Sequence, residues 1–196
     1  EDLDGNLRNS LERVRHEAGR MERIIRQLLD FGRRNPLTQS AMDCGNLLRS
    51  VTEKLEQEAR NHNVQVDIPD SKEAPPCVVH VDPIRFEQAL SNLVSNAIQA
   101  SRGKVRIRWK REENEIIITV EDNGKGVADE DLPYLFDPFF TTKPVGEGTG
   151  LGLSVAHAAV TDHGGYVEVT RSDKLGGACF TIHLPDNHGG TEPPDE

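Results

Sequence analysis

The chain has little of what marks several common protein classes. Its three cysteines, Cys44, Cys77 and Cys179, are odd in number, far apart in the sequence and outside any CxxC spacing. This pattern argues against a disulfide framework and against a zinc site, and it fits a reducing cytoplasm. No apolar run approaches the roughly 20 residues needed to cross a bilayer, and the N-terminus lacks the basic-then-apolar pattern of a signal peptide. We therefore expect a soluble chain without membrane contact.

Basic residues are also in the minority. The 23 Lys and Arg against 33 Asp and Glu give a formal net charge of −10. A basic face of the kind that binds a phosphate backbone is therefore not expected, and nucleic acid is excluded as a partner. At 196 residues, with 35% hydrophobic residues, the chain has room for one globular core and a smaller element.

The smaller element is predicted at residues 1–36, as one long helix. Its apolar residues are spaced alternately by four and three positions, which is the pattern of a heptad seam. A single helix cannot bury such a narrow seam, so we favour packing in a helical bundle or a homodimer over packing on the chain's own globular domain. The residues of the seam are Leu7, Leu11, Val14, Ala18, Met21, Ile25 and Leu28.

The globular domain is predicted at 37–185, after a linker from Gly32 to Ser40, and residues 186–196 read as a disordered tail. Asp43 is a candidate N-cap for a helix to about His62, and Asp82-Pro83 for a helix to about Ser101. A third helix is expected from about Leu151 to His163. Six runs read as strands: 64–68, 77–81, 104–110, 116–120, 166–171 and 178–184. Between them, glycine and proline dominate 121–152, and a loop of that length is usually functional.

Two asparagines on the second of these helices are candidate ligands for a cation. Asn92 and Asn96 are four residues apart and therefore share a helix face. Amide oxygens suit a hard cation such as Mg²⁺, which otherwise takes phosphate oxygens and water. Taken alone, the pair is more often two solvated asparagines.

Two further segments could hold a nucleotide. Asp122 ends an apolar run and precedes Gly124 and Gly126, so a carboxylate and a closely approaching backbone could meet a flat base. Gly146, Gly148, Gly150 and Gly152 lead into a helix, whose free N–H groups attract phosphate. This run is neither a Walker P-loop nor a Rossmann fingerprint, because no Lys-Ser or Lys-Thr follows it and no strand precedes it. Lys143 lies just upstream, where its ammonium could reach terminal phosphates.

In order and spacing, these segments resemble the boxes of the histidine kinase catalytic domain. NLVSNAIQA is similar to the asparagine box, DNGKGV to the first glycine box, LFDPFFTTK to the phenylalanine box and GTGLGLS to the second glycine box. The resemblance covers residues 40–185 and implies an α+β fold, the Bergerat-type (GHKL) α/β sandwich. Such a fold has a mixed sheet with helices on one face, and here a long bundle helix would precede it.

The resemblance also implies roles for individual residues. Asn96 would bind Mg²⁺, Asn92 would lie beside it, and Asp122 would contact adenine. Phe136, Phe139 and Phe140 would anchor a lid over the triphosphate. Asn92, Asn96 and Lys143 are the expected catalytic residues. The expected ATP contacts are Asn92, Asn96, Asp122, Gly124, Gly126, Phe136, Phe140, Thr142, Lys143, Gly148, Thr149, Gly150, Leu151 and Gly152.

Position 99 departs from the pattern of the histidine kinases, and position 92 distinguishes the kinases from the related ATPases. Many family members carry a basic residue three positions after the metal-binding asparagine, whereas this chain has Gln99, so Lys143 is expected to supply that charge. Similarity to the gyrase, chaperone and mismatch-repair ATPases would place a water-activating glutamate at position 92. Asn92 is a poor general base, which favours phosphoryl transfer over hydrolysis.

The resemblance implies a two-component sensor kinase, with ATP and Mg²⁺ as cofactors and a response regulator as partner. It would be cytoplasmic, or the cytosolic part of a membrane-anchored sensor. The acceptor histidine box is not found: Phe31 stands at its position before Asn35-Pro36-Leu37, and His16-Glu17 matches only its start. We therefore expect ATP binding without self-phosphorylation, and read His157 and His163 as structural. A nucleotide-responsive dimerisation module and a GHKL-type ATPase are the alternatives.

Overall fold

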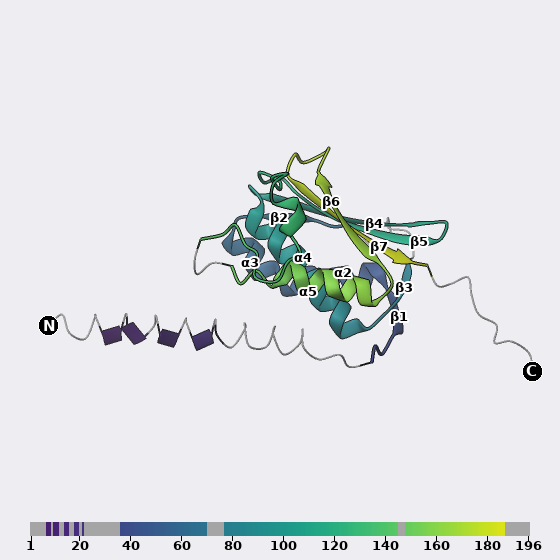
Figure 1. Cartoon of the computed structure of the whole chain (residues 1–196), viewed down its shortest axis with the longest axis horizontal. Helices are drawn as coiled ribbons and strands as arrows, with labels where there is room; N and C mark the ends of the chain where they lie inside the picture. The colour runs from purple at the N-terminus through teal and green to yellow at the C-terminus, as the bar shows by residue number, and fades with distance from the viewer. Residues whose placement is uncertain are drawn as a thin grey trace, which may run out of the picture.

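The computed structural model describes residues 36–69, 77–144 and 148–186, together with nine positions between Leu7 and Met21. The elements form two layers, a sheet and a set of helices that cover one of its faces (Figure 1). The helices are α2 (Cys44–Lys54), α3 (Glu56–Asn61), α4 (Pro83–Ala100) and α5 (Gly152–Asp162), with a 3₁₀ turn η1 at Leu132–Tyr134. The strands are β1 (Ser40–Asp43), β2 (Gln65–Asp67), β3 (Val78–Val81), β4 (Lys104–Glu112), β5 (Glu115–Asp122), β6 (Tyr166–Arg171) and β7 (Ala178–Pro185).

The main sheet has five strands in the order β2-β4-β5-β7-β6. Strand β2 runs parallel to β4, and the other neighbours are antiparallel. The sheet is therefore mixed, with helices on one face, and the α+β sandwich expected from the sequence is confirmed. The hairpin β4–β5 is longer than predicted, because its pairing extends to Glu112 and Glu115 at the turn.

Strand alternation fixes which side chains form the core. In β4, Val105, Ile107 and Trp109 face the helices and are buried, while the arginines between them face outward. The same alternation buries Ile116, Ile118 and Val120 of β5 and Phe180 and Ile182 of β7. Helix α4 lies across this surface with a fully buried stripe from Phe86 to Ile98. Truncation of such a side chain, for example Phe86 to Ala, typically costs about 3–5 kcal/mol.

The helix starts follow the predicted caps. The Asp43 carboxylate accepts a hydrogen bond from the Asn46 N–H at 2.8 Å. The Asp82 carboxylate accepts from the N–H groups of Ile84 (3.2 Å) and Arg85 (3.1 Å), ahead of Pro83 at the first helical position. The predicted helix to His62 is instead two helices, because the chain breaks at Leu55, where ψ rises to 3°.

Strand β1 was not predicted, since its segment was assigned in part to the linker. Ser40–Asp43 pairs antiparallel with β3 in a separate two-stranded sheet. Only Met42 of this strand is a large apolar residue packed against the core, so the strand carries almost no hydrophobic alternation that would reveal it.

The fold also joins two cysteines that are distant in the sequence. Cys44 and Cys77 are both buried, their sulfur atoms lie 3.3 Å apart as hydrogen-bonded thiols, and the Cys44 N–H donates to the Cys77 carbonyl at 2.8 Å. The hydrogen bond to Cys77 raises the pKa of Cys44 far above its usual range, while the same bond lowers the pKa of Cys77. Both cysteines are free thiols, and their separation of 33 residues along the chain gave no sign that they would meet in the fold.

The N-terminal positions that the structure describes are helical and solvent-exposed. Leu7, Leu11, Val14 and Met21 of the predicted seam have about 60% of their surface exposed, so this stripe is not buried by the chain itself. The rest of the predicted helix, including Ile25 and Leu28, the domain boundary near residue 36 and the predicted tail from 187 lie outside the described residues. Among the described helices, none is both long enough and apolar enough to cross a membrane.

The Asp82 cap should be measurable as stability. Replacing Asp82 by Ala removes the acceptor for the first turn of α4 and for the Thr38 N–H, and we expect a loss of about 1 kcal/mol in the free energy of unfolding in urea. Asp82→Asn keeps an acceptor oxygen and should lose less. Equal losses in the two variants would contradict the capping role.

The same cap predicts a pH dependence. Burial raises the pKa of Asp82, but the N–H groups of Arg85, Thr38 and Ile84 outweigh it, so the net pKa is lowered. The contribution of the cap is therefore present above the unfolded-state pKa and is lost as the pH falls through the folded-state pKa. The decrease in unfolding free energy between neutral and acidic pH should be smaller in Asp82→Asn.

Candidate nucleotide-binding site

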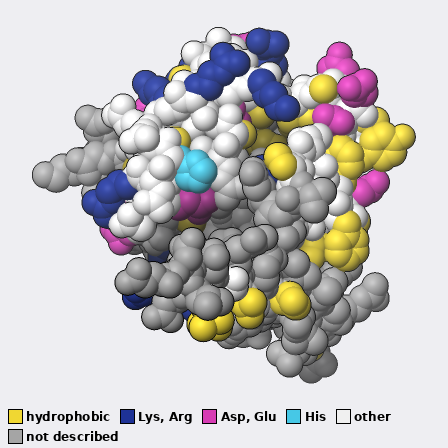
Figure 2. Space-filling model, turned by 90° about the vertical axis from the view of Figure 1, so that its left-hand side faces the viewer, with side chains coloured by type: hydrophobic (Ala, Val, Ile, Leu, Met, Phe, Trp, Pro, Cys, Tyr) yellow, Lys and Arg dark blue, Asp and Glu magenta, His cyan; other side chains and the backbone are white. Residues whose placement is uncertain are grey.

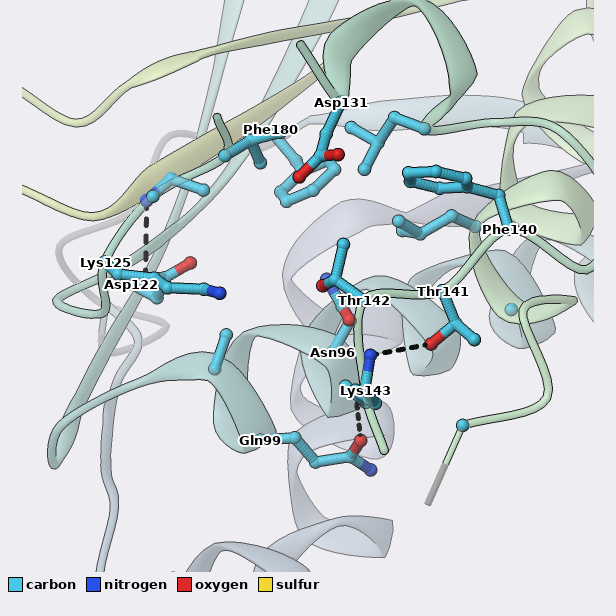
Figure 3. A pocket seen from close by; sticks show the side chains of 18 of the residues that line it. Asn96, Gln99, Asp122, Lys125, Asp131, Phe140, Thr141, Thr142, Lys143 and Phe180 are labelled. Atoms are coloured by element: carbon cyan, nitrogen blue, oxygen red, sulfur yellow. Dashed lines mark hydrogen bonds between the residues drawn. The ribbon is translucent and has the colours of Figure 1, made fainter. Parts of the chain in front are cut away.

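A cavity of about 990 Å³ opens between α4, the segment after β5 and the start of α5. Its size suits a nucleotide. Figure 3 shows Asp122 on one side of this cavity and Asn96, Gln99 and Lys143 on the other. The sequence-predicted residues that line it are Asn92, Asn96, Asp122, Gly126, Phe140, Thr142, Lys143, Gly148, Thr149, Gly150 and Gly152. Three others, Gly124, Phe136 and Leu151, are not among the residues that line it.

Helix α4 presents both asparagines to the cavity because its opposite face is committed to the core. Asn92 Oδ1 accepts a hydrogen bond from Gln88 Nε2 at 3.1 Å. The Asn92 amide nitrogen is buried and has no hydrogen-bond partner among the described residues. An unpaired buried donor is costly. Asn96, one turn further on, lines the cavity with no side-chain bond to the described residues.

Asp122 ends β5 with its carboxylate almost fully buried, at 1% exposure. Its Oδ1 accepts from the N–H groups of Gly124 (2.7 Å) and Ala178 (3.3 Å), which leaves Oδ2 without a described partner. Burial raises the pKa of Asp122, and the two backbone hydrogen bonds oppose that rise. A buried acceptor held so firmly is suited to a ligand N–H group, such as an exocyclic amine.

Glycines are required where the backbone crowds this carboxylate. A Cβ on Gly124 would lie 2.2 Å from the Ala100 carbonyl oxygen, and one on Gly177 would lie 2.1 Å from Asp122 Oδ1. Gly126 has a φ of +80°, which disfavours any other residue. Gly177 was not singled out from the sequence, and the Gly176-Gly177 pair before β7 is the signal that could have revealed it.

The second glycine segment joins the lid region to α5. Gly150 has a φ of +67°, and its carbonyl accepts from the Phe139 N–H at 2.9 Å. A Cβ there would lie 2.3 Å from the Phe139 carbonyl carbon. Leu151 is the buried N-cap of α5 and has no side-chain cap, although its own N–H donates to Thr149 Oγ1 at 3.3 Å. The first turn of α5 therefore keeps N–H groups for an anion. Gly146 lies outside the described residues.

The three phenylalanines differ in their contacts. Phe136 stacks on His157 of α5, with ring centroids 4.7 Å apart. The Phe140 ring lines the cavity and lies 6.1 Å from the Tyr134 ring. Phe139, expected to anchor the lid, instead has a 61% exposed side chain and a φ of +70°. Its backbone, through Gly150, makes the contact that its ring was expected to make.

Lys143 extends across the cavity to α4, where its ammonium donates to Gln99 Oε1 (Figure 3). Gln99 occupies the position where a basic residue was expected by resemblance. A lysine from the lid side therefore reaches the location of the missing charge, next to Asn96. The described residues hold no group of three or more His, Cys, Asp or Glu side chains that could bind a metal, so a cation here needs phosphate oxygens as additional ligands.

The predicted structural roles of two histidines are confirmed. His163 is buried, with Nε2 accepting from the Asp82 N–H at 2.8 Å and its ring against Phe86. His157 forms the stack with Phe136. His16 and Phe31 lie outside the described residues.

The fold and the cavity together define a nucleotide-binding α/β sandwich of the Bergerat type. The chain belongs to the family of histidine kinase-, DNA gyrase B- and HSP90-like ATPases, which matches residues 81–188. Within this family, the curated proteins it is similar to include sensor histidine kinases.

Those relatives match over most of the chain. It is 36% identical over 173 residues to sensor histidine kinase ZraS of Escherichia coli K12, covering 87% of this chain and 36% of ZraS. It is 33% identical over 184 residues to sensor histidine kinase CpxA of the same organism, covering 89% of this chain and 39% of CpxA. The chain thus spans well under half the length of these curated relatives.

Solved structures agree. Histidine kinase AdeS of Acinetobacter baumannii superposes with a TM-score of 0.66 at 28% identity, covering 96% of this chain and 86% of AdeS. Histidine kinase ThkA, solved in complex with response regulator protein TrrA, gives a TM-score of 0.75 at 26% identity, covering 92% of this chain and 52% of ThkA.

The glycine argument can be tested without a ligand. Gly124→Ala should destabilise the fold by about 1–3 kcal/mol, because the new methyl group collides with backbone. Gly152→Ala is the control, since its Cβ would lie 3.8 Å from Asn92 at ordinary contact distance and a helical alanine is favoured over glycine. Thermal unfolding should show a lower Tm only for Gly124→Ala; unchanged stability in that variant would sink the close-approach argument.

Proposed function

We propose that this domain transfers the γ-phosphoryl group of ATP to a histidine, for relay to an aspartate of a response regulator. The observation that carries the proposal is the state of position 92. An ATPase of this fold would use a carboxylate there to activate water, whereas position 92 here is an amide, whose oxygen already accepts a hydrogen bond from Gln88 Nε2. A neutral amide is too weak a base to remove a proton from water. The γ-phosphoryl is then left for another nucleophile.

The proposed roles follow from the placement of each group. Asp122 Oδ2 accepts from the adenine amine, Gly126 brings backbone close to the base, and the Gly124 N–H holds the Asp122 carboxylate in place. Asn96 is a Mg²⁺ ligand through its amide oxygen, and the other ligands are phosphate oxygens and water. Bound Mg²⁺ would neutralise charge on the triphosphate. Lys143 adds a positive charge at the same end, and the α5 N–H groups meet the phosphates.

The lid assignment rests on the contacts around the two aromatic anchors. Phe136 packs on His157 of α5, and Phe140 lines the cavity. The Phe139 N–H donates to the Gly150 carbonyl, so the chain is held to the domain both before Thr141 and at Gly150. Thr142, Lys143, Gly148 and Thr149 then lie in the part that would close over the triphosphate.

The partners are proposed on separate grounds. The exposed seam between Leu7 and Met21 suits a homodimer through the N-terminal helix of residues 1–36, since such a seam is stable only when paired. ThkA is solved with a response regulator, and we propose a receiver domain of that kind as the downstream partner.

We propose that the ATP-binding domain of this chain is cytoplasmic and does not bind nucleic acid. On the face that Figure 2 shows, Lys and Arg side chains lie at the top and along the left edge, and Asp and Glu side chains lie at the right and also beside the basic ones. This mixed pattern differs from the continuous basic face of a nucleic-acid binder.

The decisive experiment supplies the acceptor separately. The chain is incubated with radiolabelled ATP, Mg²⁺ and a purified helix pair that carries a histidine box, and the product is tested for acid lability. We expect an acid-labile phosphohistidine on the added helix pair and none on the chain alone. A chain that binds ATP but never labels the acceptor would be a nucleotide-responsive dimerisation module.

The ATP-site roles predict two losses of binding. Asn96→Asp places a carboxylate against the triphosphate, and Asp122→Ala removes the adenine acceptor. Both should abolish measurable ATP binding by titration calorimetry in the presence of Mg²⁺, while thermal unfolding shows that each variant folds. Unchanged affinity in both would remove the site assignment.

Position 92 predicts a gain. Asn92→Glu introduces the missing base, so steady-state ATP hydrolysis should rise by roughly a hundredfold above wild type, the lower end of the usual effect of a positioned general base. Asn92→Gln, which lengthens the side chain by the same amount without adding a base, is the matched control. Wild-type hydrolysis already as fast as that of Asn92→Glu would indicate an ATPase.

A further inference from the structure

A carboxylate outside the cavity is linked to the lid lysine through one amide. Glu58 of α3 is partly buried and faces α4, where Glu58 Oε1 accepts from Ser95 Oγ at 2.7 Å and from Gln99 Nε2 at 2.6 Å. Gln99 Nε2 also donates to Ser95 Oγ at 3.1 Å. On the other side, Gln99 Oε1 accepts from the Lys143 ammonium.

These bonds fix the orientation of the Gln99 amide. An amide nitrogen has two N–H donors, and both are used, one by Glu58 and one by Ser95. The reversed amide would place its carbonyl oxygen against the Glu58 carboxylate, and two acceptors cannot bond. The oxygen therefore points away from α3, toward Lys143. Because an amide whose N–H donates to an anion is polarised toward its oxygen, the Glu58 carboxylate also strengthens the hydrogen bond that Gln99 Oε1 accepts from the ammonium.

The intermediate amide matters for the charge of Lys143. A carboxylate at position 99 would pair directly with the ammonium and cancel its charge beside the phosphates. A neutral amide oxygen accepts from the same ammonium without cancelling its charge, and the Glu58 carboxylate stays one residue further from the cavity. Gln99 is thus a neutral partner that Lys143 can exchange for a phosphate oxygen.

We propose that Glu58 is a positioning residue for the ATP site, which acts through Ser95 and Gln99 to hold Lys143 at the phosphate end of the cavity. This inference rests on the proposed ATP-binding function. It adds a residue from α3, a helix that contributes nothing to the cavity lining, and it explains how a chain with Gln99 in place of a basic residue keeps a cation beside Asn96.

The test is a double-mutant cycle on the full chain, read by calorimetry. Glu58→Gln keeps the shape but can present its own N–H groups to Gln99, which allows the amide to turn and release Lys143. We expect Glu58→Gln to weaken Mg²⁺-ATP binding by about three- to tenfold, as loss of one hydrogen bond implies. Lys143→Met should weaken it at least as much. In the Lys143→Met background, Glu58→Gln should have no further effect, because its only route to the ligand is gone.

Two controls separate positioning from a general loss of structure. Glu56→Gln removes a carboxylate from the same helix, where Glu56 pairs with Arg60 on the surface at 2.9 Å, and its affinity should match wild type. Adenosine contains the base without phosphates, so its affinity should be equal in wild type and Glu58→Gln.

Three results would contradict the positioning role, and a fourth would contradict the proposed function itself. Additive losses in the double variant, an equal loss for adenosine, or no effect of Glu58→Gln on Mg²⁺-ATP would overturn the positioning role while leaving the ATP site intact. Failure of the wild-type chain to bind Mg²⁺-ATP at all would instead overturn the proposed function, and the positioning role with it.

Discussion

Helix α4 carries both the centre of the hydrophobic core and the polar residues of the nucleotide site. Its stripe from Phe86 to Ile98 is fully buried against the sheet and α5, and successive residues on a helix are about 100° apart. A rotation by one residue would therefore expose this stripe and bury the asparagines. The free energy that fixes the rotation comes from apolar burial, and it places Asn92, Ser95, Asn96 and Gln99 along the other side without any contribution from ligand binding.

The opposite end of the cavity depends on close backbone approach rather than on side-chain packing. Asp122 is buried at the end of β5, and the cost of burying a carboxylate is offset by N–H groups from Gly124 and Ala178. Those donors come near enough only because residues 124 and 177 have no Cβ. The two ends thus use different means: α4 positions amides by its rotation, and the β5 end positions one acceptor by excluding side chains. The distance between them is set by the core that lies beneath both.

The sequence predicted the parts of this fold that are encoded locally. Asp82-Pro83 specifies the start of α4 through a cap and a fixed φ, and alternation in β4 and β7 specifies which residues face the helices. Strand β1 was not predicted because its pairing with β3 is non-local and its four residues show little alternation of apolar and polar side chains. In the site, Asn96 and Asp122 lie in recognisable boxes, whereas the Ala178 donor and Glu58 are brought to it by tertiary packing across tens of residues. The expectation that Phe139 anchors the lid has a related limit: an apolar ring suggests burial, but residue 139 has a positive φ and its ring is exposed.

In this chain the positive charge beside Asn96 comes from Lys143 and not from a basic residue on α4, and this affects how closing the cavity is coupled to phosphate binding. A basic residue at position 99 would sit on the rigid α4 and carry its charge beside Asn96 whether or not anything covers the cavity. With Gln99 there, the charge belongs to the segment after Phe140, and its place beside Asn96 depends on a hydrogen bond between that segment and α4. Under the proposed function, binding of the triphosphate and docking of this segment become thermodynamically linked, because whatever stabilises Lys143 at Gln99 also prepares the site for phosphate. The hydrogen bonds of Gln99 with Glu58 and Ser95 then affect how far that segment is docked before ATP binds. Under the proposal, part of the control of the site therefore comes from Glu58 of α3, which lies outside the four boxes.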